Sequence, residues 1–373
     1  MHPWLILALA SCLPLSAAAG EMVIGLYGVG PAEQKDLPKI REAGFNAVQT
    51  YVSNADWDSF FKACAKHRIR AVIPPGSGPA DYATAVAQAG NPPALLAWYL
   101  VDEPDYQNHP PERTAREASQ LRATGTRTPI AFVLGDGRPA GWYARIPDIL
   151  MVDWYPIPHL PLASFGLAVR QCRFAAGPEK PLWGVVQAFD WTDFPESFPR
   201  SAQLGIRGFP TEDELRAMAY LNFVEGGTGI FFFAYNYANR TPERWATLRA
   251  VSRDLRRHAP LLSAPTVWSH LDLWIEPDRP RWRNELGDAA LQACRKRVEK
   301  ASGPVRAGDY LLVVNTTREK RESGLRVPGL PDQPVPVLGS SQPAPVRAGW
   351  IRDTFPPLAV RIYGPLPVPS KKP

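Results

Sequence analysis

The segment WYLVDEP, residues 98–104, ends an apolar run with two adjacent carboxylates and a proline. A near-continuous apolar run of this kind is typical of a strand that is buried on both faces of a parallel sheet. Proline is confined to the margins of buried strands, so the strand is expected to end here. Asp102 and Glu103 are therefore predicted to lie at the edge of a sheet, where a loop begins.

Short apolar runs alternate with amphipathic segments on both sides of this stretch. Eight apolar runs are predicted as strands, at residues 22–27, 45–52, 70–74, 95–101, 129–134, 148–154, 181–189 and 229–235. Eight such βα units in about 240 residues favour a closed (β/α)8 TIM barrel over an open doubly wound sheet. The Gly-rich turn of a dinucleotide-binding fold is also missing, because residues 25–30 lack the required glycine spacing and Pro31 follows them.

The character of the sequence changes after Pro260. Strand-like segments at 267–274, 289–297, 309–315 and 358–363 lie between Gly, Pro and charged turns, without helical periodicity. This pattern predicts a small antiparallel β-sandwich of about 100 residues, packed on the barrel. The predicted organisation is a signal peptide at 1–20, the barrel at 21–262, the β-sandwich at 263–366 and a tail at 367–373.

The first twenty residues, MHPWLILALASCLPLSAAAG, form an apolar stretch that ends in small residues. This is typical of a secretory signal with its cleavage site, although no Lys or Arg precedes the apolar run. We therefore expect a secreted protein, or one of the periplasm or cell envelope. Residues 9–12 also resemble a bacterial lipobox, so a lipid anchor at Cys12 is the alternative. No second apolar stretch of about 20 residues occurs, and no membrane span is expected.

Charge and cysteine content argue against several other classes of protein. The net charge is +6, but acids interleave with much of the Arg and Lys, and no nucleic-acid partner is expected. Beyond the signal, Cys64, Cys172 and Cys294 form an odd, widely spaced set, which predicts buried small hydrophobes and no disulfide framework. Since no CxxC pair or closely spaced His pair occurs, no metal or cofactor is expected.

The active site of a (β/α)8 barrel lies at the C-terminal ends of its strands, so the predicted strand ends supply the candidates. They are mainly carboxylates and aromatics: Tyr51, Asp102, Glu103, Asp153, Trp154, Tyr155, Gln187, Trp191 and Tyr235. Cleavage of a glycosidic bond uses one carboxylic acid to protonate the leaving oxygen and a second carboxylate to attack or to activate water. Flat aromatic faces bind the C–H surfaces of sugar rings. The mixture therefore favours a carbohydrate as substrate.

Glu103 is the predicted general acid, because a carboxyl group that follows an apolar run is desolvated and its pKa rises. The alternative for Glu103 is a helix cap, and the alternative for Asp153, the predicted second carboxylate, is a turn anchor. The remaining candidates are interpreted as substrate-positioning groups (Asp102, Gln187 and Tyr235) and as surfaces for sugar rings (Tyr51, Trp154, Tyr155 and Trp191).

The WYLVDEP segment resembles the strand-four signature of clan A glycoside hydrolases, in which an Asn-Glu-Pro triplet carries the acid/base. Asp102 stands where that signature has Asn, and Glu103 aligns with the acid/base. Residues 207–235 and 350–363 are similar to the seventh-helix region and the last sandwich strands of related secreted bacterial barrel proteins. The resemblance implies a glycoside hydrolase that acts on an oligo- or polysaccharide.

The sequence departs from this family at the predicted seventh strand. Clan A enzymes carry the nucleophilic Glu there, whereas this chain has Gln187, which cannot form a glycosyl-enzyme ester. Three explanations stay open. Glu103 works with Asp153 or Asp190 across the gap of an inverting enzyme, about 6.5–9.5 Å; a substrate N-acetyl group replaces the nucleophile, oriented by Gln187 or Asp153; or the protein is a non-catalytic carbohydrate-binding or envelope protein on a degenerate barrel. A barrel hydrolase that cleaves another kind of bond is a further rival.

Overall fold

The computed structural model describes residues 21–53, 55–194, 208–267, 274–275 and 283–367 of the 373-residue chain. The predicted signal peptide, including Cys12, and most of the predicted tail lie outside the described residues. None of the helices in the described ranges combines the length and apolar character that a membrane crossing requires.

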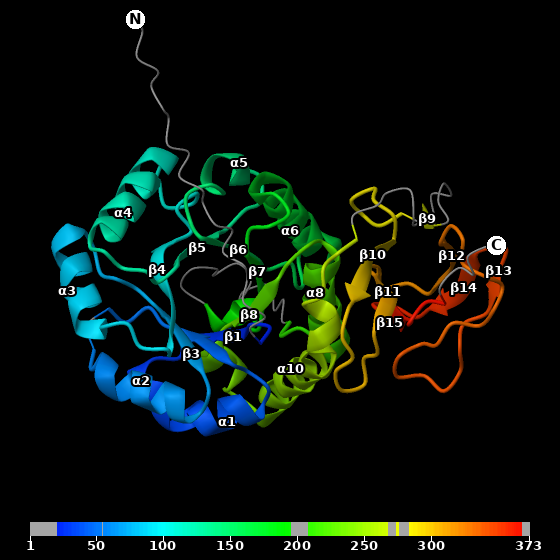
Figure 1. Cartoon of the computed structure of the whole chain (residues 1–373), viewed down its shortest axis with the longest axis horizontal. Coiled ribbons are helices and arrows are strands. Elements are labelled where there is room, and N and C mark those ends of the chain that lie inside the picture. Colours follow the sequence, from blue (N-terminus) through cyan, green and yellow to red (C-terminus); the bar gives the residue numbers. More distant parts are fainter. Residues whose placement is uncertain (1–20, 54, 195–207, 268–273, 276–282, 368–373) are drawn as a thin grey trace, which may run out of the picture.

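Eight parallel strands close into a barrel in chain order, and the last strand pairs with the first. They are β1 (Ile24–Tyr27), β2 (Ala47–Gln49), β3 (Arg70–Ile73), β4 (Leu95–Asp102), β5 (Ile130–Leu134), β6 (Ile149–Trp154), β7 (Leu182–Gln187) and β8 (Gly229–Phe233). A ring of helices surrounds them in Figure 1. The predicted (β/α)8 barrel is confirmed.

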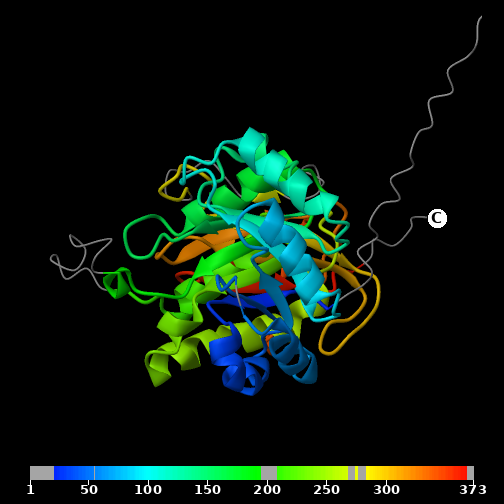
Figure 2. The ribbon, with the colours of Figure 1, turned by 90° about the vertical axis from the view of Figure 1, so that its left-hand side faces the viewer.

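The helices that surround the barrel begin at clear capping signals. The side chain of Asp56 accepts the Ser59 N–H at the start of α2, and Thr211 and Glu214 form a reciprocal capping box at the start of α8. The helices are η1 (Pro31–Asp36), α1 (Leu37–Glu42), α2 (Trp57–Lys66), α3 (Pro79–Ala89), α4 (Pro111–Ala123), α5 (Ala140–Tyr143), α6 (Ala163–Ala176), η2 (Trp191–Asp193), α8 (Glu212–Val224), α9 (Tyr235–Ala238) and α10 (Pro242–Leu262). In Figure 2 the N-terminal helices, in blue and cyan, stand in front of the strands.

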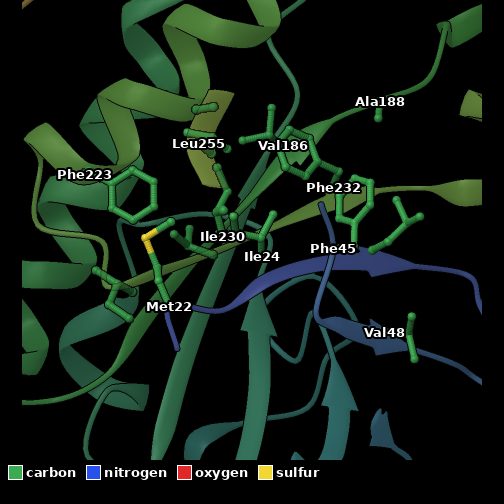
Figure 3. Packing of buried hydrophobic residues seen from close by; sticks show 14 of the residues in the cluster. Met22, Ile24, Phe45, Val48, Val186, Ala188, Phe223, Ile230, Phe232 and Leu255 are labelled. Atoms are coloured by element: carbon green, nitrogen blue, oxygen red, sulfur yellow. The ribbon is translucent and has the colours of Figure 1, made fainter. Parts of the chain in front are cut away.

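The two faces of the strands build two separate apolar layers. Ile24, Val186 and Phe232 point outward into one apolar cluster, to which Phe223 of α8 and Leu255 of α10 also belong (Figure 3). The inward residues fill the barrel itself, and they include Tyr27, Tyr99, Met151, Trp183 and Phe231. The interior at the C-terminal end of the barrel therefore carries tyrosine hydroxyls, which need polar partners.

Two antiparallel sheets follow α10 and confirm the predicted β-sandwich (Figure 1). One sheet has the order β10 (Leu291–Val298), β11 (Gly308–Asn315), β15 (Val360–Tyr363), and the other has the order β13 (Val346–Arg347), β14 (Trp350–Phe355), β12 (Arg321–Arg326), β9 (Trp274–Ile275). Strand β12 was not predicted from the sequence because Arg, Glu and Gly dominate it. The strand predicted at 267–274 falls largely outside the described residues.

The sandwich packs on the barrel through α6, α8 and α10. An ion pair joins Arg318 to Glu214 of α8 at 2.6 Å, and Arg170 of α6 contacts Asp288 at 3.1 Å. Cys294 packs against α8, and it is a buried free thiol like Cys64 and Cys172, as predicted.

Candidate functional site

Glu103 follows β4 directly, and its backbone has a φ of 40°, a left-handed conformation that is uncommon outside glycine. Its carbonyl oxygen accepts the N–H groups of Tyr106 and Gln107 at 3.0 and 3.1 Å, which closes a tight turn. A non-glycine residue in this conformation costs on the order of 1–2 kcal/mol, and such residues cluster at functional sites. The turn aims the Glu103 side chain along the rim of the barrel.

A β-bulge in β4 sets the direction of the preceding carboxylate. Tyr99 pairs with Ala131 of β5, but the next pairing joins Asp102 to Val133, so β4 contains one extra residue. Bulges of this kind re-aim side chains and are frequent next to active sites. Asp102 therefore comes into phase with Tyr99 and points to the barrel interior, where simple alternation along the strand would have placed Val101.

The carboxyl groups of Glu103 and Asp153, which lies on β6 two strands away, line the same cavity, and the charge of Glu103 raises the pKa of Asp153. Asp153 is only 7% exposed, and its Oδ2 accepts the hydroxyl of Tyr155 at 2.8 Å. No N–H or O–H group of the described residues reaches Asp153 Oδ1. The two side chains thus form a carboxyl pair with few other partners.

The environment of this pair favours its protonated forms. Burial raises the pKa of Glu103 to about 7, the charge of Asp102 adds to the effect, and the neighbouring Asp153 carboxyl group partly offsets it. Burial raises the pKa of Asp153 well above its ordinary range, and the charge of Glu103 acts in the same direction. The two groups titrate together, and near neutral pH the pair retains at least one proton. An acid with a pKa near 7 is suited to proton donation.

Two tyrosine hydroxyls reach the carboxylate of Asp102, and a third tyrosine extends this chain of hydrogen bonds. The hydroxyl of Tyr99 donates to Asp102 Oδ1, and the hydroxyl of Tyr51 lies 3.4 Å from the same oxygen. Tyr27 extends the chain with its hydroxyl 3.4 Å from that of Tyr99. Burial raises the pKa of all three phenols, so they remain donors at neutral pH, and burial also raises the pKa of Asp102. These contacts hold the Asp102 carboxylate in place beside Glu103.

A cavity of about 480 Å³ opens beside the carboxyl pair, and we call it the catalytic cavity. Its lining is mainly aromatic and consists of Glu103, Tyr106, Gly135, Asp153, Trp154, Tyr155, Leu160, Phe189, Trp191, Phe194 and Phe233. Phe189 packs edge-on against both Tyr155 and Trp191, each at 5.0 Å between ring centroids, and Trp154 donates to Ser164 at 2.8 Å. The rings are therefore held in fixed orientations around the carboxyl pair.

The structure brings most of the predicted site residues together. Five of them line the catalytic cavity: Glu103, Asp153, Trp154, Tyr155 and Trp191. Asp102 and Tyr51 lie beside it, joined to each other through the hydrogen bond at Asp102 Oδ1. The two predicted residues that are not brought to the cavity are Gln187 and Tyr235.

Gln187 ends β7 as predicted, but it is fully buried and does not line the cavity. Its Oε1 accepts the Ile157 N–H at 2.9 Å, and its Nε2 donates to the carbonyl oxygens of Ile157 and Phe189 at 2.7 and 3.2 Å. The predicted substrate-positioning role is therefore corrected. These backbone groups already engage both ends of the amide, and the side chain joins the loop after β6 to the end of β7.

Tyr235 is also placed elsewhere, because β8 ends at Phe233 and Tyr235 begins the short helix α9. Its ring stands edge-on to Trp245 at 5.7 Å, and its hydroxyl accepts a hydrogen bond from Asn239 at 3.1 Å. The predicted strand continued to residue 235 and would have turned this side chain to the rim. Phe233 occupies the corresponding place in the cavity wall.

Tyr106 lines the cavity but was not among the predicted residues, because it lies in a loop without any periodic pattern. The backbone of Gly135 makes room for it: a Cβ at this glycine would stand 2.4 Å from the Tyr106 ring and 3.2 Å from the Glu103 carboxyl carbon. Tyr27 and Tyr99 were also missed, although the inward alternation of β1 and β4 places tyrosines where apolar residues are usual. In the described residues no cluster of three or more His, Cys, Asp or Glu side chains is arranged to hold a metal ion.

No model of a known protein family matches the chain, and no curated protein does. Solved structures match its fold at low identity. An Anoxybacillus α-amylase, described as belonging to a new glycosyl hydrolase subclass, aligns with a TM-score of 0.55 and 10% identity over 92% of this chain and 97% of that chain. AmyP in complex with maltose gives 0.53 and 10% identity over 91% and 90% of the two chains. A mutant of the trehalulose synthase MutB gives 0.51 and 11% identity over 92% and 98%.

These alignments span the barrel and the β-sandwich together. The chain therefore has a TIM-barrel fold like that of glycoside hydrolases, followed by a C-terminal β-domain. At such low identity the likeness concerns the fold, and a fold alone does not determine the chemistry of its site.

Proposed function

We propose that the protein is a glycoside hydrolase that cleaves O-glycosidic bonds of an oligo- or polysaccharide, with Glu103 as its general acid. The observation that carries this proposal is the pair of carboxyl groups of Glu103 and Asp153, both with raised pKa values, which line an aromatic cavity at the C-terminal rim of the barrel. The glycoside hydrolase-like fold supports a carbohydrate as the ligand.

In this proposal a sugar ring lies against the aromatic wall, and protonated Glu103 donates its proton to the glycosidic oxygen. The C–O bond then breaks, the leaving group departs as an alcohol, and positive charge develops at the anomeric carbon. The nearby carboxylates Glu103 and Asp102 stabilise this charge in a site that excludes much of the solvent.

The second step is not assigned to Asp153, because burial raises its pKa well above the ordinary range and it is still protonated when Glu103 acts as the acid. A retaining or an inverting glycosidase needs an ionised second carboxylate for this step. Gln187 provides no nucleophile. Attack on the anomeric carbon is therefore assigned to water, which passes its proton to a carboxylate of the site (Asp102 or the ionised Glu103) as the new C–O bond forms, or to a substrate N-acetyl group. The anomeric configuration of the first product, measured by NMR, distinguishes inversion by water from retention by the acetamido route.

The test is a screen of aryl glycosides and glycans against the purified protein, its Glu103→Gln variant and a Glu179→Gln control. Glu179 is an exposed carboxylate before β7, so it lies at the opposite end of the barrel from the site. We expect Glu103→Gln to lower kcat by at least about a hundredfold and Glu179→Gln to have no effect. Activity that survives in Glu103→Gln removes Glu103 as the acid.

The second candidate function is a carbohydrate-binding protein without catalytic activity, and it is favoured by the structural use of Gln187 in place of a nucleophilic Glu. Such a protein would bind a sugar in the aromatic cavity without cleaving it. Glycan binding by the unmodified protein, with no product from any glycan that it binds, would select this candidate.

We also propose that the protein is exported, because its first twenty residues have the pattern of a signal peptide. Cell fractionation and N-terminal sequencing of the mature protein test this, with a new N-terminus expected near residue 21. A lipid-modified N-terminus at Cys12, abolished by Cys12→Ser, would select the anchored form. A cytoplasmic protein that still begins at Met1 would contradict export.

A further inference from the structure

A second cavity of about 680 Å³ lies next to the catalytic cavity, and Tyr106 forms part of the wall of both. We call it the outer cavity. It is built by the loop between β4 and α4 and by the segment between β5 and the end of α5. Its lining includes the polar groups of Asn108, Asp136 and Arg138, and Trp142 supplies a flat apolar surface.

Trp142 is unusually exposed for a tryptophan, with 75% of its surface accessible, and Tyr106 is 55% exposed. The Trp142 side chain stays exposed because its neighbours in α5 are buried and hold the helix in place. Ala140 and Tyr143 are buried, and the Tyr143 hydroxyl donates to the His109 carbonyl at 3.0 Å. A large exposed apolar surface beside polar groups is typical of a binding site.

The loops of the outer cavity are tied together before any ligand arrives. The carboxylate of Asp105 accepts the N–H groups of Gly135 and Asp136 at 3.1 and 3.0 Å, and it thereby joins the loops that follow β4 and β5. Asp136 in turn accepts the backbone N–H and the Nε of Arg138 at 2.8 and 2.6 Å. A preorganised site of this kind loses little conformational entropy on binding.

We propose that the outer cavity is a second sugar-binding subsite, which holds further units of a saccharide chain whose reacting bond lies in the catalytic cavity. Trp142 supplies a stacking face, and Asn108, Asp136 and Arg138 bind hydroxyl groups at the edges of the ring. The shared wall at Tyr106 lets one chain occupy both cavities. This inference rests on the proposed function and adds to it the place where further sugar units of the substrate bind.

The experiment compares Trp142→Ala with Phe174→Ala. Phe174 is 91% exposed on α6 and lines a different cavity beside the β-sandwich, so its variant controls for the loss of an exposed aromatic. Binding of disaccharides to hexasaccharides from cellulose, chitin, mannan and xylan is measured by calorimetry with both variants in the Glu103→Gln background. Turnover of the same series and of aryl monoglycosides is measured in the active background.

We expect Trp142→Ala to weaken binding and lower kcat/KM at least about tenfold for the longer chains, and to leave aryl monoglycosides unchanged. Phe174→Ala should bind and turn over every substrate in the series as its parent protein does. If turnover depends on Glu103 but Trp142→Ala matches its parent at every chain length, the subsite is refuted and the proposed function stands. Chain-length-dependent binding that Trp142→Ala abolishes, without turnover, supports the subsite and refutes catalysis. Absence of any binding refutes both.

Discussion

The carboxyl group of Glu103, just after β4, shares a cavity with the carboxyl group of Asp153 on β6, and the charge of Glu103 raises the pKa of Asp153. No cation lines the cavity beside this pair in the described residues, so burial and neighbouring negative charge dominate its protonation. The carboxyl group of Glu103 can therefore stay protonated up to about pH 7. The pH dependence of catalysis and that of stability both follow from this relationship.

The first prediction concerns the alkaline limb of the pH–rate profile. Glu103 must be protonated to act, so kcat/KM should fall as the pH rises through about 7. The charge of Asp102 is one cause of the raised pKa of Glu103, and Asp102→Asn removes it. We therefore expect the limb to move to lower pH in Asp102→Asn, measured with an aryl glycoside under first-order conditions. A limb that moves upward would show that Asp102 does not act on Glu103 through its charge.

The second prediction concerns stability and needs no substrate. The pKa of Glu103 is raised from 4.5 to about 7 in the folded state, so between these values the folded protein binds more protons than the unfolded chain. The free energy of unfolding should therefore decrease as the pH rises through this window. Because Glu103 is partly exposed, we expect its share to be only about 1–2 kcal/mol.

Glu103→Gln removes this titration, so the variant should gain stability over the unmodified protein as the pH rises from 4.5 to 7.5. Chemical denaturation at several pH values measures the difference, with Glu179→Gln as the control. A constant difference across this range would mean that Glu103 has an ordinary pKa in the folded protein.

The barrel was predictable from the sequence, whereas the detailed site was only partly so. Buried parallel strands appear as apolar runs, and the rule that the active site lies at their C-terminal ends located Glu103 and Asp153. The β-bulge in β4 has no such signal. It arises in the pairing with β5, and it decides that Asp102 points inward beside Tyr99. Strand alternation alone would have turned Asp102 away.

Gln187 and Tyr235, the two predicted residues that do not reach the cavity, show a second limit. Gln187 was located at the correct strand end, but its role depends on the backbone of Ile157, thirty residues away in the chain. Tyr235 was misplaced because strand ends are uncertain by one or two residues, and a shift of this size changes the side to which a residue points. Tertiary partners, and not local pattern, decided both outcomes.

The third prediction tests the left-handed backbone at Glu103. Glu103→Gly and Glu103→Ala both remove the carboxyl group, but only glycine adopts a φ of 40° without steric cost. We expect Glu103→Gly to be more stable than Glu103→Ala by about 1 kcal/mol, measured by chemical denaturation at one pH. Equal stability of the two variants would indicate that the turn relaxes once the carboxyl group is absent.

The fourth prediction is that Gln187→Glu does not restore a nucleophile. A carboxylate at this position would lose the donor that serves the carbonyl oxygens of Ile157 and Phe189, and it would repel both of them. We expect destabilisation by about 3 kcal/mol or more and no gain in activity. Gln88→Glu, on the exposed face of α3, is the matched control and should change stability by less than about 0.5 kcal/mol. A stable and faster Gln187→Glu enzyme would show that this side chain reaches the substrate.

The last prediction follows from the charge of the catalytic cavity. The described residues that line it include the carboxyl groups of Glu103 and Asp153 but neither Lys nor Arg, and Asp102 lies just behind them. A neutral sugar loses little electrostatic free energy when it enters such a site. A uronic acid, in contrast, brings a second negative charge into a partly desolvated space. Like charges placed together at a binding site cost several kcal/mol.

We therefore expect aryl glycosides of neutral sugars to bind at least about tenfold more tightly than those of the matching uronic acids at pH 8. The difference should shrink at pH 5, because Glu103 is protonated there and most of the repulsion is lost. In Glu103→Gln the difference should vary less with pH, since the titrating carboxyl group is gone. Calorimetry with matched glucoside and glucuronide pairs measures all three quantities. Equal affinity for the two sugars, or a preference for the uronic acid, would show that a cation outside the described residues neutralises the cavity.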